Sequence, residues 1–147
     1  MPDAENRTGR KATANGLTAD RCAGIAVDRG NAVLLLHELR HALDRLLANS
    51  EETVIDLARL PLGPADEVAL DAMLGDGEIA ATVRVMGDSS VEETAFPGVW
   101  RITHRDDGGR VQARFLSVCW IPEILRAQRI DVEDGVRRLT EMVESDQ

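Results

Sequence analysis

The strongest hydrophobic pattern in the chain lies between Asn31 and Ala48. At 100° per residue, the apolar positions of this stretch fill one broad arc of a helical wheel. They are Leu34, Leu35, Leu36, Leu39, Ala42, Leu43, Leu46 and Leu47. The pattern predicts an amphipathic helix that packs on a core.

Two short elements are predicted next. Residues 53–57 (Thr-Val-Ile-Asp-Leu) are typical of a short strand, and the prolines that follow end it. Pro64 suits the first position of a helix over about residues 65–74. Asp66 and Glu67 lie in its first turn, where the helix dipole favours anions, and Gly75 marks its end.

The hydrophobic period then changes from 3.6 to 2. Residues 79–86 alternate apolar and polar side chains, and Gly87-Asp88 indicates a turn before a strand over residues 91–96. The turn at Gly87 could hold two or three residues, and the sequence leaves this register open.

A second hairpin is expected to turn at residues 106–109 (Asp-Asp-Gly-Gly). A loop of two residues and one of four give the same cross-strand partners. The expected pairs are Trp100 with Phe115, Ile102 with Ala113, and His104 with Val111. One face of this hairpin should therefore be apolar and carry an aromatic pair.

The opposite face of the same hairpin carries two arginines. Arg101 is expected opposite Arg114. Like charges directly opposite each other are destabilising. We therefore expect a carboxylate or an anionic partner between them.

The end of the chain should be helical. Residues 122–128 suit one or two helical turns, and residues 131–144 a last helix despite Gly135. Residues 1–20 have the composition of a disordered tail, which leaves residues 21–147 as a single domain. The order of elements predicts an α+β fold: an antiparallel sheet of about four to five strands with helices packed on one face.

Composition narrows the class of protein. A chain of 147 residues with 44% hydrophobic content supports one domain. It has no run of 18 apolar residues, and its start is charged where a signal peptide would be apolar, so we expect a cytoplasmic protein without a membrane partner. Cys22 and Cys119 do not form a disulfide or zinc pattern; Cys119 is expected in a buried strand.

The net charge of -9 has one source. Residues 51–96 hold 11 acids against Arg59 and Arg84, while the rest of the chain is nearly balanced. Such a segment repels nucleic acid and favours a basic partner. Ordinary solubilising charge is the alternative.

Residues 37–41 (His-Glu-Leu-Arg-His) match a zinc-protease pattern, in which two histidines one turn apart bind the metal. On the helical wheel, however, His37 and His41 fall opposite the leucines, together with Asp44. No third ligand follows at a suitable spacing. We interpret this stretch as a solvated helix face and expect no metal, cofactor or catalytic residue.

Glu92 and Glu93 are the most informative acids. Adjacent residues of a strand point to opposite faces, so one of them must face the apolar residues or the arginines. Its expected partner is Arg84, Arg101 or Arg114. An internal salt bridge and a recognition site are both open interpretations.

Four segments carry a family resemblance. They are residues 56–62 (DLARLPL), 74–79 (LGDGEI), 92–101 (EETAFPGVWR) and 120–123 (WIPE). Together they resemble the conserved C-terminal region of the hydrogenase expression/formation proteins of the HupH/HyaF type. The resemblance implies a non-enzymatic accessory protein in nickel-iron hydrogenase maturation, which assists the iron-sulfur small subunit before its export. Family members are about twice as long, so a homodimer that mimics the longer chain is a further expectation.

The leading hypothesis is therefore an assembly chaperone that binds a hydrogenase small subunit precursor or another maturation protein. The candidate binding residues are Glu92, Glu93, Thr94, Pro97, Gly98, Trp100, Arg101 and Arg114. Within this set we expect Trp100 to be core and the charged residues to serve recognition. The alternatives are a small metal-binding protein or metalloenzyme built on His37, His41 and His104, and a structural subunit of a larger complex.

Overall fold

The computed structural model describes residues 30–85 and 87–146; the predicted tail and Cys22 lie outside them. The elements, in order, are α1 (Gly30–Asn49), β1 (Thr53–Asp56), the 3-10 helix η1 (Leu57–Arg59), α2 (Pro64–Leu74), β2 (Ala80–Arg84), β3 (Asp88–Glu93), β4 (Val99–Arg105), β5 (Val111–Val118), the 3-10 helix η2 (Glu123–Leu125) and α3 (Arg129–Ser145). This confirms the α+β prediction.

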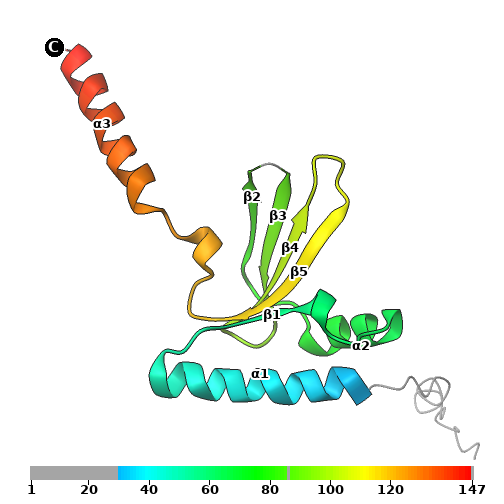
Figure 1. Cartoon of the computed structure of the whole chain (residues 1–147). Coiled ribbons are helices and arrows are strands. Elements are labelled where there is room, and N and C mark those ends of the chain that lie inside the picture. Colours follow the sequence, from blue (N-terminus) through cyan, green and yellow to red (C-terminus); the bar gives the residue numbers. More distant parts are fainter. Residues whose placement is uncertain (1–29, 86, 147) are drawn as a thin grey trace, which may run out of the picture.

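The five strands form one antiparallel sheet in the order β1-β5-β4-β3-β2. Helices α1 and α2 lie together at the base of the sheet (Figure 1). Their buried side chains share one core with Val99, Leu116 and Val118 of the two central strands. We call this the covered face of the sheet.

Local chemistry explains why α2 begins where it does. Pro64 occupies its first turn, and the Asp66 carboxylate accepts a hydrogen bond from the Gly63 N–H at 3.1 Å. Leu70 and Leu74, four residues apart, then point into the core and are 1% exposed. The helix start predicted from the sequence is confirmed.

The opposite face, which we call the uncovered face, has a smaller cluster. Val91, Trp100 and Cys119 are buried there, and Ile124 and Leu125 of η2 pack against them. The Trp100 indole N–H donates to the Cys119 carbonyl at 3.1 Å. Trp100 is thus a core residue, and Cys119 is a buried free thiol, as expected.

The predicted register of the second hairpin is wrong by two residues. Trp100 lies opposite Ser117, and Ile102 opposite Phe115, so the expected Trp100–Phe115 pair does not form. The reason is the loop, in which Asp106 accepts the N–H groups of Arg110 and Gly108, both at 2.9 Å. These bonds lower the pKa of Asp106 and hold a five-residue loop. Beside this loop, a β-bulge between His104 and Arg105 shifts the register of the two strands.

The first hairpin settles the register that the sequence left open. Arg84 pairs with Asp88, so three residues connect β2 to β3. Glu92 consequently lies opposite Arg101, on the covered face, and Glu93 lies opposite Trp100, on the uncovered face.

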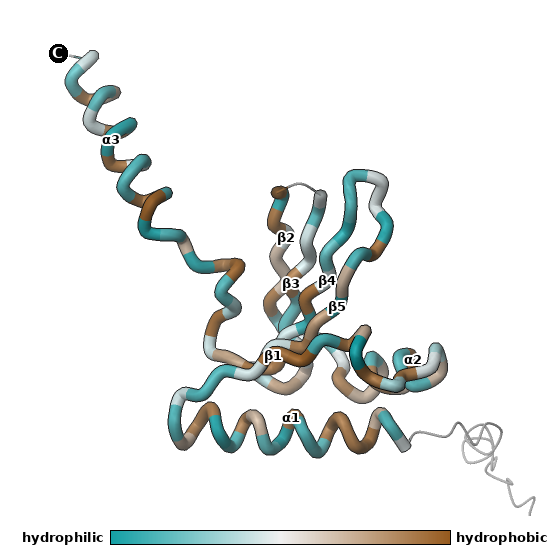
Figure 2. The backbone as a smooth tube through the Cα atoms, in the orientation of Figure 1, coloured by the Kyte–Doolittle hydropathy of each residue, from teal (hydrophilic) through white to brown (hydrophobic). Residues whose placement is uncertain are grey.

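Helix α3 departs from the prediction that the helices pack on the sheet. It projects away from the rest of the domain, and brown apolar positions alternate with teal polar ones along it (Figures 1 and 2). None of its residues is buried. No helix in the described ranges is long and apolar enough to cross a membrane.

Candidate functional site

The segment from Glu92 to Arg101 forms the end of β3, a tight loop and the start of β4. Thr94, 1% exposed, holds the loop: its hydroxyl accepts from the Phe96 N–H and its own N–H donates to the Val99 carbonyl. Gly98 has φ = 87°, a conformation that favours glycine, and its Cα faces the Leu43 side chain of α1. Thr94 and Gly98 therefore shape the loop.

An apolar groove lies between this loop and α1. Its volume is about 250 Å³. Leu36, Leu39, Arg40, Leu43, Leu74, Phe96 and Val99 line it. Phe96 is 46% exposed and Pro97 is exposed beside it, so the loop presents an accessible aromatic ring at the groove.

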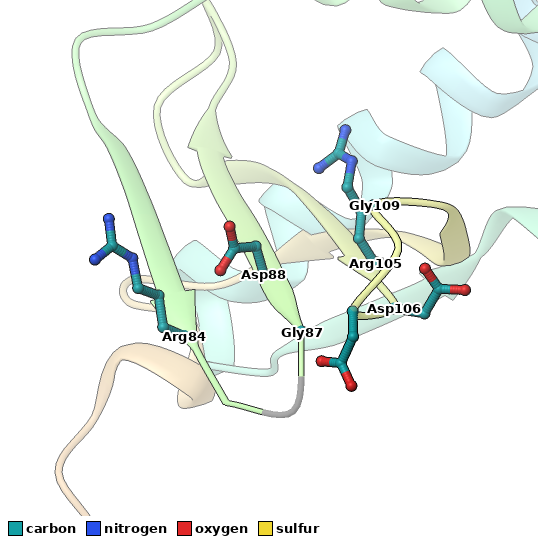
Figure 3. A pocket seen from close by; sticks show the side chains of 7 residues that line it. Arg84, Gly87, Asp88, Arg105, Asp106 and Gly109 are labelled. Atoms are coloured by element: carbon teal, nitrogen blue, oxygen red, sulfur yellow. The ribbon is translucent and has the colours of Figure 1, made fainter.

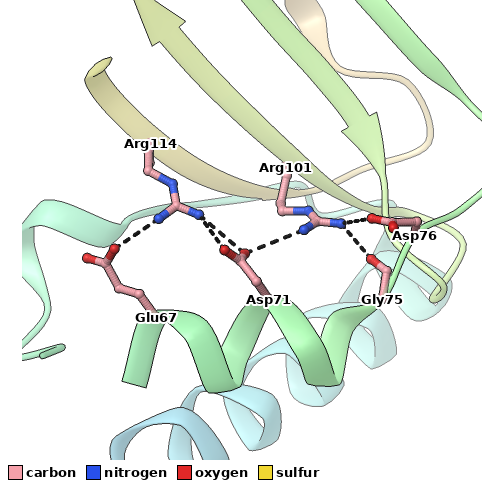
Figure 4. A network of polar contacts seen from close by, with 6 residues as sticks. All are labelled: Glu67, Asp71, Gly75, Asp76, Arg101 and Arg114. Carbon is pink, nitrogen blue, oxygen red and sulfur yellow. Dashed lines mark hydrogen bonds and ion pairs between the residues drawn. The ribbon is translucent and has the colours of Figure 1, made fainter. Parts of the chain in front are cut away.

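The two arginines of the hairpin are held inside the molecule. Arg114 donates to Glu67 at 3.0 Å and to Asp71 at 3.0 and 3.2 Å (Figure 4). Arg101 reaches the other side of Asp71 at 3.5 Å and donates to Asp76 at 2.7 Å. The two arginines are not directly opposite each other as predicted, because the shifted register pairs Arg101 with Leu116 and Arg114 with Thr103. The expected carboxylate between them is present, and its source is α2.

Arg101 also completes the end of α2. Its guanidinium donates to the Gly75 carbonyl at 2.5 Å, where the negative end of the helix dipole lies. The Ala95 N–H donates to the Leu74 carbonyl at 2.9 Å in the same region. The arginine thereby fixes the helix end on which the groove loop rests.

Glu92 and Glu93 have no such partners. Glu92 is exposed and Glu93 half-buried, and within the described ranges neither forms an ion pair. Of the two interpretations left open, the internal salt bridge is therefore wrong, because α2 supplies the carboxylates instead.

Part of the acidic excess is likewise compensated. Six acids of residues 51–96 form ion pairs: Glu51, Glu52, Asp56, Glu67, Asp71 and Asp76. Four of the arginines that pair with them, Arg45, Arg101, Arg114 and Arg126, lie outside that segment. Counting charge along the sequence thus overstates the field of this region.

The histidines of α1 lie where the helical wheel placed them. His37 and His41 are both exposed. The ring of His41 lies 3.4 Å from the guanidinium of Arg40, its neighbour in the chain. In the part of the chain that the structure describes, no three His, Cys, Asp or Glu side chains are placed to hold a metal ion.

A second hollow opens at the tips of the hairpins. Its volume is about 370 Å³, and charged side chains from neighbouring strands line it (Figure 3). Arg84 and Arg105 share this lining with three acids, Asp88, Asp106 and Asp107. Because opposite charges are mixed, this hollow selects neither an anion nor a cation.

The fold and the groove define the class of protein. It is an α+β domain with two helices packed at one face of an antiparallel sheet, one of them ion-paired to it, and with an apolar groove beside the loop after β3. The chain belongs to the family of the HupH hydrogenase expression protein, C-terminal conserved region, whose model matches residues 30–145.

Individual relatives agree with this membership. The hydrogenase expression/formation protein HoxQ of Azotobacter vinelandii is 32% identical over 106 residues, which cover 72% of this chain and 36% of HoxQ. The hydrogenase-1 operon protein HyaF of Escherichia coli (strain K12) is 28% identical over 112 residues, covering 76% of this chain and 39% of HyaF. The chain thus spans less than half the length of these relatives.

A solved structure supports the fold. The hydrogenase expression protein HupH from Thiobacillus denitrificans ATCC 25259 superposes with a TM-score of 0.74 at 42% identity. The match covers 80% of this chain and 98% of that chain.

The sequence-based list of candidates missed the α1 side of the groove. Leu36, Arg40 and Leu43 were assigned to a helix without a site, and Phe96 was left out of the binding set. One signal was present: the apolar arc of α1 is broader than a single core contact requires.

Proposed function

We propose that this chain is a non-enzymatic accessory protein in nickel-iron hydrogenase maturation. It binds a hydrogenase small subunit precursor, or another maturation protein, at the groove beside Phe96. The observation that carries the proposal is that the loop of the family-like segment, held by Thr94 and Gly98, builds an accessible apolar groove against α1.

The groove suggests the chemistry of its partner segment. Leu36, Leu39 and Leu43 recur along α1 with the spacing of one helical face, and Phe96 lies across from them. Arg40, the charged residue of the lining, forms no ion pair with another described residue. A segment with apolar anchors and a nearby carboxylate fits this lining.

The candidate residues then have different roles. Thr94, Gly98, Trp100, Arg101 and Arg114 are buried or internally bonded and support the loop. Phe96 and Pro97 make the contact. Glu92, which lies on the covered face and has no ion-pair partner in the described ranges, would recognise a basic group of the partner nearby, whereas Glu93 lies on the other face of the sheet.

One pair of side chains resembles part of a catalytic site and must be weighed against a non-enzymatic function. The Ser89 hydroxyl lies 2.7 Å from His104 Nδ1, which resembles a nucleophile and its base. Ser89 is only 8% exposed, however, and the His104 ring packs against Phe115 in a T-shaped arrangement. Among the residues that the structure describes, no carboxylate is hydrogen-bonded to His104 to orient its ring.

The test is capture from hydrogenase-producing cells with a tagged chain. The wild type should recover a hydrogenase subunit precursor or a maturation protein, and Phe96→Asp should recover at least about tenfold less, as expected for loss of an interface anchor. Val68→Asp is the matched control, because Val68 is an exposed apolar residue of α2 outside the groove.

Circular dichroism should show both variants folded. The proposal fails if the wild type captures no hydrogenase component. It also fails if Phe96→Asp and Val68→Asp reduce capture equally.

A further inference from the structure

Helix α3 carries an apolar stripe that nothing in the described structure covers. Val132, Val136, Leu139 and Val143 recur at spacings of four, three and four residues, and Met142 lies beside them. Their exposed fractions run from 53% for Val132 to 68% for Met142. A stripe of this kind on a soluble helix normally packs on a partner.

The helix is nevertheless preformed. Arg129 pairs with Glu133, Arg137 with Asp134 and Glu141, and Arg138 with Asp134, all at spacings of three or four residues. Such pairs stabilise a helix without tertiary contacts. The polar side of α3 is therefore satisfied internally, and its apolar side is left available.

The uncovered face of the sheet offers a matching surface. A hollow of about 220 Å³ opens on it, with Val54, Ile102, Phe115 and Ile124 among its lining residues. Val54 is 67% exposed, and Ile102 and Phe115 are half-buried. Helices α1 and α2 lie on the other side of the sheet, so they leave this face open.

We propose that two copies of the chain exchange α3, so that the stripe of each helix covers the uncovered sheet face of the other copy. The dimensions agree: 17 residues of helix span about 25 Å, and the seven- and eight-residue strands β4 and β5 span about 24–27 Å. Leu139 or Met142 would enter the hollow as a knob.

The direction of α3 favours a second copy over the same chain. Ile124 and Leu125 of η2 are packed on the sheet, and Arg126 donates to Glu52 at 2.8 Å. The helix begins three residues later and points away from its own sheet (Figure 1). For α3 to dock on its own sheet, the link of residues 126–128 would have to reverse direction. A reciprocal exchange with a second copy keeps the link in the conformation seen here.

The area also suits a closed dimer. Aliphatic side chains of this size each bury about 60–120 Å², so five partly exposed ones supply about 300 Å² per helix. Two helices and two receiving faces together give about 1,200 Å² of apolar surface, which reaches the range of stable interfaces before polar atoms are counted. A two-fold exchange satisfies both copies and leaves no open end.

The experiment measures the mass of the full chain by light scattering during size exclusion. The wild type should elute as a dimer of about 32 kDa, twice the 16.0 kDa chain. Leu139→Asp, on the stripe, and Val54→Asp, on the receiving face, should each be monomeric. Ser145→Asp, on the polar side of α3, and Thr82→Asp, exposed on the other face of β2, are the controls and should remain dimeric.

Mixing the two disrupted variants gives the most specific result. The Leu139→Asp copy keeps an intact receiving face and the Val54→Asp copy keeps an intact helix, so the mixture should recover a heterodimer with one of its two docking sites. A wild type that stays monomeric up to about 100 μM, far above the dissociation constant of a stable dimer, overturns the proposal. So does a mixture that stays monomeric, or a dimer that survives both disrupting substitutions.

Discussion

The two faces of the sheet differ in how completely their apolar side chains are buried. On the covered face, Leu116 and Val118 are 0% exposed beneath α1 and α2, and five charged side chains form a continuous ion-paired ladder. On the uncovered face, Ile102 and Phe115 remain half-buried, and Ile124 and Leu125 of η2 pack against the cluster around Trp100. The core beneath α1 and α2 is closed by the chain itself, whereas apolar residues of the uncovered face stay only partly buried in it.

This difference separates charge that stabilises the fold from surface that can recognise a partner. Arg101 and Arg114 are the most conspicuous cations of the hairpin, yet α2 occupies both of them. The accessible features lie elsewhere, at the margin of the covered face beside Phe96 and across the uncovered face. Recognition is therefore expected from apolar surface more than from the arginine pair.

Neighbouring residues of β5 test the comparison most strongly. Leu116→Ala should lower the free energy of unfolding by about 3 kcal/mol, because it leaves a cavity in the covered core. Phe115→Ala should cost only about 1–2 kcal/mol although it removes a larger side chain, since Phe115 is only partly buried. Urea denaturation in the Leu139→Asp background measures both without cover from a second copy.

At equally buried sites, Phe→Ala usually destabilises a protein at least as much as Leu→Ala does, and this is the order that would contradict the comparison. If Phe115→Ala costs more than Leu116→Ala in that background, the uncovered face is packed as tightly as the covered one.

The ladder gives the next largest effect. Asp71→Asn removes the negative charge that lies between Arg101 and Arg114. Each guanidinium group then keeps one carboxylate partner, Asp76 or Glu67. We expect a loss of about 1–2 kcal/mol in the free energy of unfolding, a moderate value because the Asp71 side chain is 39% exposed. Asp76→Asn, at a 93% exposed side chain, is the control and should change stability within the error of denaturant titration.

Salt sharpens this result. Because ions screen partly exposed charges, the difference between Asp71→Asn and wild type should shrink as sodium chloride is raised. Equal losses for Asp71→Asn and Asp76→Asn would show that the ladder contributes no more than surface charge.

Much of the covered face was predictable from the sequence, because local rules determine it. The apolar arc of α1, the proline and acids at the start of α2, and the alternation in the strands each gave the correct element. Like-charge repulsion predicted a carboxylate near Arg101 and Arg114, although the two arginines lie on one face without being directly opposite as expected. Sequence also placed His37 and His41 on the solvent side of α1.

The rest depended on distances that no local rule supplies. The hairpin register shifted because the side chain of Asp106 organised a longer loop and a bulge followed, and neither is visible in a count of glycines. Asp71 could not be named as the partner of the arginines, since 30 residues separate it from Arg101. Whether α3 would pack on its own sheet is also a tertiary question, because its amphipathic pattern fits docking in any position.

Cys119 tests the comparison at its finest level, since it belongs to the uncovered face but is 2% exposed. Burial raises the pKa of its thiol above the ordinary value of 9.0. The folded protein therefore keeps the thiol neutral, while the unfolded chain ionises it above pH 9, so its contribution to stability is full below pH 9 and declines as pH rises further.

Denaturation of wild type and Cys119→Ala at pH 7.5 and pH 10.5 should show the stability advantage of the wild type shrinking at the higher pH. Cys22 is common to both proteins and cancels in the difference, and the sequence contains no tyrosine to confuse it. A difference that stays constant with pH would mean that solvent reaches the thiol, and that the cluster around Trp100 is as open as the sheet face beside it.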